Sequence, residues 1–230
     1  MVGAMFVRTS IQKLAIIIKT NKIILMIQAI IFDMNGVIVD DERLHEEAYR
    51  QVIEKYGHKL SSAEYHNEYM GSPNPVNFQK IKEKYDLAVD VDILLREKGE
   101  AYLELAKKYL QPVPGAVRAI KVFAKKHKLA LVSSSPLLEV QMILKHFAIE
   151  QYFSVIVSGD DVKIGKPDPE PYLLAAKRLK LRPYQCMVFE DSKQGIISAK
   201  AAGMKVVALS TNLEAEDLKL ADIVMGDFLF

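Results

Sequence analysis

Short apolar runs alternate with amphipathic stretches along most of the second half of the chain. Runs of four or five apolar residues are typical of strands buried on both faces, and each is followed by a segment with helical spacing. This order predicts an α/β fold: a doubly wound, mostly parallel sheet with a Rossmann-like core and helices on both faces. The predicted strands cover residues 27–32, 129–132, 155–158, 186–189, 206–209 and 223–225, and the helices between them cover 116–126, 136–147, 169–179 and 192–202.

Residues 41–110 contain no segment with strand character. Their apolar residues recur at helical spacing and predict helices over 41–56, 62–69, 76–85 and 91–110, with 71–75 as a loop. An all-helical block of this length is too long for a simple crossover between strands, so it predicts an inserted small α-helical cap domain at 41–110. The α/β core domain is then 26–40 together with 111–230. On the last helix we expect a buried stripe of Leu94, Leu95, Ala101, Tyr102, Leu105 and Tyr109.

An N-terminal segment, residues 1–25, precedes this pattern. It carries Arg8, Lys13, Lys19 and Lys22 and no acidic residue, and lysines interrupt its apolar runs. A membrane span or a secretory signal needs an uninterrupted apolar stretch, so neither is predicted. We expect an upstream extension or a misassigned start, with a targeting or membrane-surface role as the alternative.

Composition and charge narrow the function classes. Hydrophobic residues make up 50% and charged residues 26% of the 230 residues, as in soluble globular proteins. The formal charge is +2 and no dense basic run occurs, so we expect no nucleic-acid partner and no membrane partner. The single cysteine, Cys186, excludes an internal disulfide and fits a reducing compartment, which predicts a cytoplasmic protein. The sequence gives no prediction of oligomeric state.

Polar residues follow four of the predicted strands. Taken singly, each has a simpler explanation as a turn, a helix cap or a solvated lysine, and Asn35-Gly36 alone is typical of a hairpin. The carboxyl ends of parallel strands, however, meet at one edge of a sheet. Together the residues indicate a phosphoryl-transfer site with a carboxylate nucleophile, a metal, phosphate-binding amides and a cation. In strand order they are Asp33, the run Ser133-Ser134-Ser135, Lys166, and the pair Glu190-Asp191.

Two of these groups allow a more specific prediction. Ser133-Ser134-Ser135 precedes Pro136, which we place at the first helical position, so that free N–H groups at the helix start form an anion site. Glu190 and Asp191 are adjacent acids at the end of a buried strand, where unpaired charge is costly. Hard oxygen ligands of this kind suit Mg²⁺.

The order of these motifs resembles the haloacid dehalogenase-like hydrolase superfamily. Within it the chain is similar to the β-phosphoglucomutase-like phosphatases, which carry a helical cap between the first and second motifs, and the resemblance covers residues 26–225. It implies that Asp33 is the nucleophile that becomes an aspartyl phosphate and that Mg²⁺ is the cofactor. It also implies that the metal ligands are Asp33, the backbone carbonyl of Asn35, Glu190 and Asp191, and that Lys166, Gly36, His45, Ser133, Ser134 and Ser135 contact a small phosphorylated metabolite.

Asn35 departs from the pattern that the resemblance implies. Phosphatases of this type have a second acid two residues after the nucleophile, which protonates the leaving oxygen and later activates water. An amide cannot transfer a proton, and general acid–base catalysis contributes about 10²–10⁴-fold, so turnover of ordinary phosphomonoesters is expected to be weak unless another group substitutes. Asp41, Glu42 and His45 are nearby in sequence, and nothing in the sequence selects one of them.

Two function classes compete on these grounds. The leading hypothesis is a Mg²⁺-dependent hydrolase acting through phospho-Asp33; the alternative is a catalytically impaired phosphate-binding or phosphoryl-accepting protein with a sensing or partner-binding role. A receiver domain is disfavoured because it lacks a long helical insert. Dehalogenation needs no metal, a phosphonatase needs an imine-forming cap lysine that no motif identifies, and the loop at 70–74 lacks the basic residues that hold a second phosphate in a sugar phosphomutase.

Overall fold

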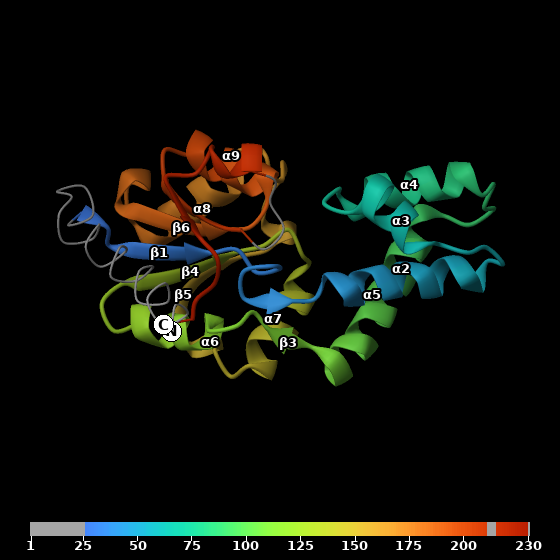
Figure 1. The fold of residues 1–230 in the computed structure, drawn as a ribbon, viewed down its shortest axis with the longest axis horizontal. Helices are drawn as coiled ribbons and strands as arrows, with labels where there is room; N and C mark the ends of the chain where they lie inside the picture. Colours follow the sequence, from blue (N-terminus) through green and yellow to red (C-terminus); the bar gives the residue numbers. More distant parts are fainter. Residues whose placement is uncertain (1–25, 211–214, 230) are drawn as a thin grey trace, which may run out of the picture. The chain divides into compact units, whose positions relative to one another are not determined.

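The computed structural model describes residues 26–210 and 215–229, so the extension predicted for residues 1–25 lies outside the described residues. The chain divides into two compact units (Figure 1). The first, here called the α/β unit, ends at Val39 and resumes at Pro112, and the second, the helical unit, is Asp40–Gln111.

Six parallel strands form the sheet of the α/β unit, which confirms the predicted fold class. Their order is β5-β4-β1-β6-β7-β8, and every pairing is parallel. From the first strand the chain runs to one side of the sheet and then to the other, so the order reverses at β1, where ligands of open α/β sheets bind. The strands are β1 (Ala29–Phe32), β4 (Lys128–Val132), β5 (Phe153–Val157), β6 (Cys186–Glu190), β7 (Lys205–Leu209) and β8 (Ile223–Met225).

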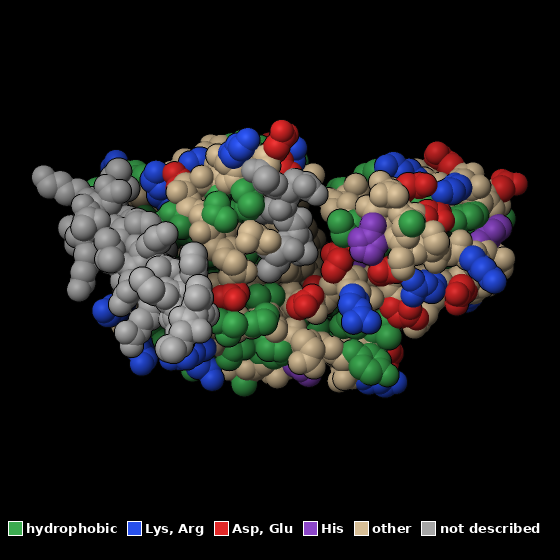
Figure 2. Space-filling model, in the orientation of Figure 1, with side chains coloured by type: hydrophobic (Ala, Val, Ile, Leu, Met, Phe, Trp, Pro, Cys, Tyr) green, Lys and Arg blue, Asp and Glu red, His purple; other side chains and the backbone are tan. Residues whose placement is uncertain are grey.

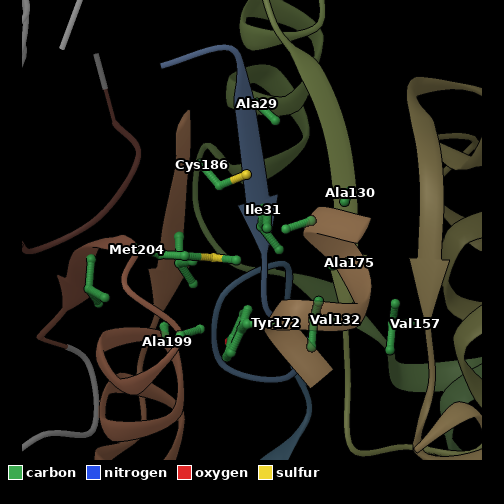
Figure 3. Packing of buried hydrophobic residues seen from close by; sticks show 14 of the residues in the cluster. Ala29, Ile31, Ala130, Val132, Val157, Tyr172, Ala175, Cys186, Ala199 and Met204 are labelled. Carbon is green, nitrogen blue, oxygen red and sulfur yellow. The ribbon is translucent and has the colours of Figure 1, made fainter. Parts of the chain in front are cut away.

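Helices cover both faces of this sheet, with α8 and α9 on one face and α6 and α7 on the other (Figure 1). Side chains of β1 alternate between the faces: Ile31 joins the apolar cluster beneath α8 and α9 (Figure 3), whereas the ring of Phe32 stacks on that of Phe189, with centroids 5.2 Å apart, on the opposite side. β1 is therefore buried on both faces, as its continuous apolar run predicts. The helices are α6 (Ala116–Phe123), α7 (Leu137–His146), α8 (Glu170–Leu179), α9 (Lys193–Ala201) and the short α10 (Ala215–Leu218).

The helical unit has an aromatic core of its own. Tyr49 stacks on Phe78 with ring centroids 4.7 Å apart, and Tyr65 and Tyr69 pack beside them. Its elements are α2 (Glu42–Lys55), α3 (Ser62–Glu64), the π-helix η2 (Tyr65–Tyr69), α4 (Asn74–Lys84) and α5 (Val91–Tyr109). Where the chain passes between the units, β2 (Val39–Asp40) and β3 (Gln111–Pro112) form a two-stranded sheet that the sequence analysis did not predict.

Several local predictions were wrong. The chain around Asn74 begins α4 and is not part of a loop, because Pro75 in the first turn has no N–H that would lose a partner. Pro136 is the extended N-cap of α7 and not its first helical residue. On α5, Tyr109 is 61% exposed, whereas Lys98, which was not expected inside, is buried between Leu94 and Tyr102 on the same stripe.

Two surface properties bear on the expected partners. Among residues 26–210 and 215–229, no helix has both the length and the apolar character needed to span a bilayer. On the visible face of the helical unit, acidic and basic side chains are interspersed (Figure 2). Within that unit, Arg50 pairs with Glu46 and Lys84 pairs with Glu64. That face therefore offers no continuous basic stripe to a nucleic-acid backbone.

Candidate active site

Asp33 lies at the carboxyl end of β1, next to the point where the strand order reverses. Its backbone N–H donates to the carbonyl of Phe189 on β6 at 3.0 Å, which extends the sheet by one residue. The chain then folds into a compact loop in which Gly36 N donates to Val39 O at 2.7 Å and Ile38 N donates to Met34 O at 2.7 Å. This loop, and not a β-hairpin, is what the Asn35-Gly36 dipeptide forms.

The side chain of Lys166 lies between Asp33, which follows β1, and Glu190, the last residue of β6. Its ammonium group donates to Asp33 Oδ1 and to Glu190 Oε1, each at 2.5 Å, and only 8% of its side chain is exposed. A lone lysine in a loop is usually solvated, so this burial between two carboxylates marks a site and not a surface contact.

Glu190 is completely buried, and hydrogen-bond donors occupy both of its oxygens. Oε1 accepts from Lys166 and from the hydroxyl of Tyr172. Oε2 accepts from the backbone N–H groups of Asp191 and Ser192 and from the Ser192 hydroxyl, at 3.1, 3.2 and 3.0 Å. The carboxylate thereby orients the lysine on one side and fixes the start of α9 on the other.

Asp191 completes an acidic cluster. Oxygen atoms of Asp33, Glu190 and Asp191 lie within 4.8 Å of one another. Gly36 makes room for the third of these carboxylates, because a Cβ at position 36 would lie 1.8 Å from Asp191 Oδ2. Among the described residues this is the one group of acidic, histidine and cysteine side chains with a spacing that could hold a metal ion.

Burial and opposite charge compete at Asp33 and Lys166. The pKa of Asp33 is raised to about 7, because burial and the neighbouring Glu190 raise it by more than Lys166 lowers it. Burial alone lowers the pKa of Lys166, but the carboxylates of Asp33 and Glu190 outweigh it, so the pKa of the lysine lies above its usual value. One ammonium group is therefore too little positive charge to keep Asp33 fully ionised at neutral pH.

The serine run follows β4, the neighbour of β1. Ser133 Oγ accepts from Ser135 N at 3.1 Å, and the Ser135 hydroxyl donates to Glu139 Oε1 at 2.6 Å. The Asn35 side-chain oxygen lies 3.4 Å from that hydroxyl oxygen. The N–H of Leu137 at the start of α7 donates to Asp160 Oδ2 at 2.8 Å.

Side chains of this chain accept from Ser135 N and Leu137 N, so these two N–H groups are already partnered. That the serine run binds a phosphoryl group stays a prediction.

The other predicted site residue, His45, belongs to the helical unit. Its Nδ1 lies 2.7 Å from Lys98 Nζ, its Nε2 lies 3.4 Å from Asp41 Oδ2, and its ring stacks on Tyr102. That His45 contacts a substrate stays a prediction.

Sequence analysis missed Tyr172, Glu139 and Lys98. In each case the signal was weak, because a polar residue on an amphipathic helix usually faces solvent. Only the i, i+4 spacing of Lys98 with Leu94 and Tyr102 could have indicated its burial.

Comparison with known proteins assigns the chain to a family. A family model described as haloacid dehalogenase-like hydrolase matches residues 30–209, from β1 to the end of β7. The chain belongs to the haloacid dehalogenase-like hydrolase family. The protein is therefore an enzyme of the hydrolase class, and the acidic cluster with Lys166 lies where the sheet of this family member reverses its order.

Relatives of this hydrolase include phosphatases. A phosphorylated carbohydrates phosphatase from Thermotoga maritima is 40% identical over 179 residues, covering 77% of this chain and 82% of that protein. A fructose-1-phosphate phosphatase from Escherichia coli is 36% identical over 182 residues, covering 77% and 94%. The crystal structure of a β-phosphoglucomutase from Clostridium difficile is 26% identical with a TM-score of 0.76, covering 88% and 92%.

Proposed function

We propose that this protein is a Mg²⁺-dependent phosphatase of small phosphorylated metabolites, with sugar phosphates as the preferred class, and that it acts through an aspartyl phosphate on Asp33. The observation that carries the proposal is the buried cluster in which Lys166 bridges Asp33 and Glu190 beside Asp191. The phosphatases of phosphorylated carbohydrates and of fructose 1-phosphate among its relatives support the substrate class.

The residues present fit a magnesium ion. Oxygen atoms of three acidic side chains lie within 4.8 Å of one another beside the ammonium group of Lys166 in a largely buried site, and hard oxygen ligands of this kind suit a divalent cation. Glu190 already accepts five hydrogen bonds. We therefore assign the ion to Asp33, Asp191 and the backbone carbonyl of Asn35, and give Glu190 the task of positioning Lys166 and the Asp191 backbone.

In the proposed reaction a carboxylate oxygen of Asp33 attacks phosphorus, and the bond from phosphorus to the leaving alcohol breaks. Water then attacks the same phosphorus, which releases inorganic phosphate and restores Asp33. Lys166 balances charge on the transferring phosphoryl group as a point charge within reach of the nucleophile. Bound Mg²⁺ would supply further charge neutralisation at the phosphoryl oxygens.

Asn35 supports a second candidate from another class, a phosphoryl-accepting protein that turns over slowly or not at all. Its amide can donate a hydrogen bond, but it cannot release a proton to a leaving alkoxide or take one from water. A phosphoenzyme would then form from acyl phosphates, whose leaving groups need no proton, and would persist.

Phosphatase assays of the native protein and of Asp33→Asn test whether hydrolysis depends on the proposed nucleophile. We expect the native protein with Mg²⁺ to hydrolyse fructose 1-phosphate, and EDTA to abolish the hydrolysis. Asp33→Asn should lose at least about 10³-fold in rate, as expected for a nucleophile, whereas the exposed control Glu54→Gln should match the native protein. Unchanged activity in Asp33→Asn contradicts the proposal.

The same samples distinguish the second candidate. Intact-mass analysis after treatment with acetyl phosphate would show one added phosphoryl group that persists without release of phosphate. Rapid turnover of sugar phosphates by the native protein excludes that candidate.

A further inference from the structure

The hydroxyl of Tyr172 on α8 reaches the site, and the proposed reaction gives it no task. The side chain is completely buried and belongs to the apolar cluster beneath α8 and α9 (Figure 3). Its hydroxyl donates to Glu190 Oε1 at 2.5 Å, and the ammonium group of Lys166 donates to that same oxygen at 2.5 Å. One carboxylate oxygen therefore holds two donors, and one of them is the cation that also contacts Asp33.

The aromatic ring of Tyr172 lies beside the same cation. The Lys166 ammonium nitrogen is 5.4 Å from the ring centroid, within the range of a cation–π contact. Only 8% of the Lys166 side chain and none of the Glu190 side chain is exposed. In a site this dry a carboxylate depends on its protein donors, so the loss of one donor changes how strongly the carboxylate attracts the other.

The helical unit contains the same three residue types in the same arrangement near its surface. Tyr85 and Lys84 both donate to Glu64 Oε1, at 2.8 and 2.9 Å, and the Lys84 ammonium nitrogen is 5.9 Å from the Tyr85 ring centroid. There, 40% of the lysine side chain and 17% of the glutamate side chain are exposed. Water can take the place of a lost donor in that group, which makes it a matched control for the buried one.

We propose that Tyr172 is a positioning residue for phosphoryl transfer, which keeps Lys166 beside Asp33 by donating to Glu190. This inference rests on the proposed phosphatase function. The hydroxyl balances part of the charge on Glu190 Oε1, so the ammonium group divides its contacts between the two carboxylates. Without the hydroxyl, Oε1 attracts the ammonium group more strongly and draws Lys166 away from the nucleophile and from the phosphoryl group.

The test compares Tyr172→Phe with Tyr85→Phe, because each variant removes a hydroxyl and keeps the ring. With Mg²⁺ and p-nitrophenyl phosphate, we expect kcat to fall by about tenfold in Tyr172→Phe, less than when a charge-stabilising donor is removed outright. In Tyr85→Phe it should change by less than about twofold. Inhibition by orthovanadate, which mimics the phosphoryl group during transfer, should weaken by about the same factor as kcat in Tyr172→Phe. A loss of folded protein would lower kcat but leave the inhibition constant of vanadate unchanged.

A second measurement does not depend on turnover. In protein that carries isotope-labelled lysine, NMR can follow the buried Lys166 ammonium group, whose resonance is identified by its loss in Lys166→Ala. We expect this resonance to shift in Tyr172→Phe and to stay in place in Tyr85→Phe. The inference is overturned if the Lys166 resonance does not move, if vanadate inhibition is unchanged in Tyr172→Phe, or if the two variants lose activity equally.

Failure of the proposed function has a different signature. In that case the native protein releases p-nitrophenol no faster than Asp33→Asn does, and the positioning role of Tyr172 fails with it. If Asp33→Asn abolishes release while Tyr172→Phe behaves like Tyr85→Phe, the proposed phosphatase function stands and only the role of Tyr172 is wrong.

Discussion

At the scale of single residues, two glycines determine how closely the acidic groups of the site approach the backbone. A Cβ on Gly36 would lie 1.8 Å from Asp191 Oδ2, and a Cβ on Gly195 would lie 1.8 Å from Glu190 Oε1. The carboxylates of Asp191 and Glu190 therefore occupy the space that a side chain at position 36 or 195 would fill. Gly36 also has a φ of +71°, a conformation that L-residues with a side chain rarely adopt.

We predict that Gly36→Ala weakens Mg²⁺ binding, because Asp191 must move away from the new methyl group. The Mg²⁺ concentration for half-maximal activity should rise about 10–100-fold, the range seen when groups that orient metal ligands are disturbed. Gly57→Ala is the matched control: its φ is +82°, but no atom lies within 4 Å of its Cβ position. Both variants should lose about 1–2 kcal/mol in the free energy of unfolding, measured in EDTA.

Equal shifts in Mg²⁺ dependence for the two variants would show that backbone strain, and not contact with Asp191, is responsible.

The sequence predicted site residues where a polar group ends an apolar run, as Asp33 and Asp191 do. It did not predict Tyr172, whose partner is fixed only by the three-dimensional packing of the chain, or Glu139, whose partner Ser135 is four positions away. Tyr172 reaches Glu190 across 18 positions, and Glu139 extends the Asn35–Ser135 pair, whose members are 100 positions apart. Residues this far apart in the sequence leave no periodic pattern from which their contact could be predicted.

At the scale of elements, the turn after β5 holds the serine loop in position. Asp161 closes a capping box on Ser158, accepting from its backbone N–H and its hydroxyl, each at 2.9 Å. Arg178 of α8 donates to Asp161 Oδ1 at 2.5 Å and to the Ile156 carbonyl at 2.8 Å. The turn is thereby tied to α8, and its Gly159 donates to the Ser135 carbonyl.

Asp161→Asn should lower the free energy of unfolding at neutral pH by about 1 kcal/mol, a modest figure because the pair is partly exposed. The hydrogen bond from Arg178 lowers the pKa of Asp161 from 3.8 to about 2, against the effect of burial. A lowered folded-state pKa stabilises the protein above the unfolded-state value and less so as pH falls toward the folded one. Urea titrations should therefore show the difference from the native protein shrinking from about pH 4 to pH 2.

A difference that stays constant over that pH range would mean that the charge of Asp161 contributes nothing. The exposed variant Glu54→Gln serves as the control for a general effect of removing one acid.

The sequence predicted which segments are strands or helices more accurately than it predicted their first and last residues. β1, β4 and β6 coincide with their predicted apolar runs to within two residues, because buried parallel strands have a continuous apolar composition. Within the helix predicted at 62–69, residues 65–69 form a π-helix, and Ser61 caps the short α-helix before it. Period alone does not distinguish these helix types, which differ by one residue in their hydrogen-bond spacing.

At the scale of the whole molecule, the groups proposed for phosphoryl transfer all belong to one unit. Asp33, Ser135, Lys166 and Asp191 lie in the α/β unit, which has its own apolar cluster on the sheet. The helical unit has a separate aromatic cluster around Tyr49. Two independent cores indicate that each unit gains most of its stability from its own contacts.

This separation predicts that the α/β unit folds and is phosphorylated without the helical unit. β2 pairs with β3, so a short Gly/Ser linker can replace residues 41–110 and connect the two strand ends. With acetyl phosphate and Mg²⁺, intact-mass analysis should show one phosphoryl group on the shortened chain, and none after Asp33→Asn in the same background. A shortened chain that unfolds cooperatively in urea but takes up no phosphoryl group would place an essential group in the helical unit, because folding and nucleophile would both be intact. His45 and Lys98, whose ring and amine nitrogens lie 2.7 Å apart, would then be the first residues to replace.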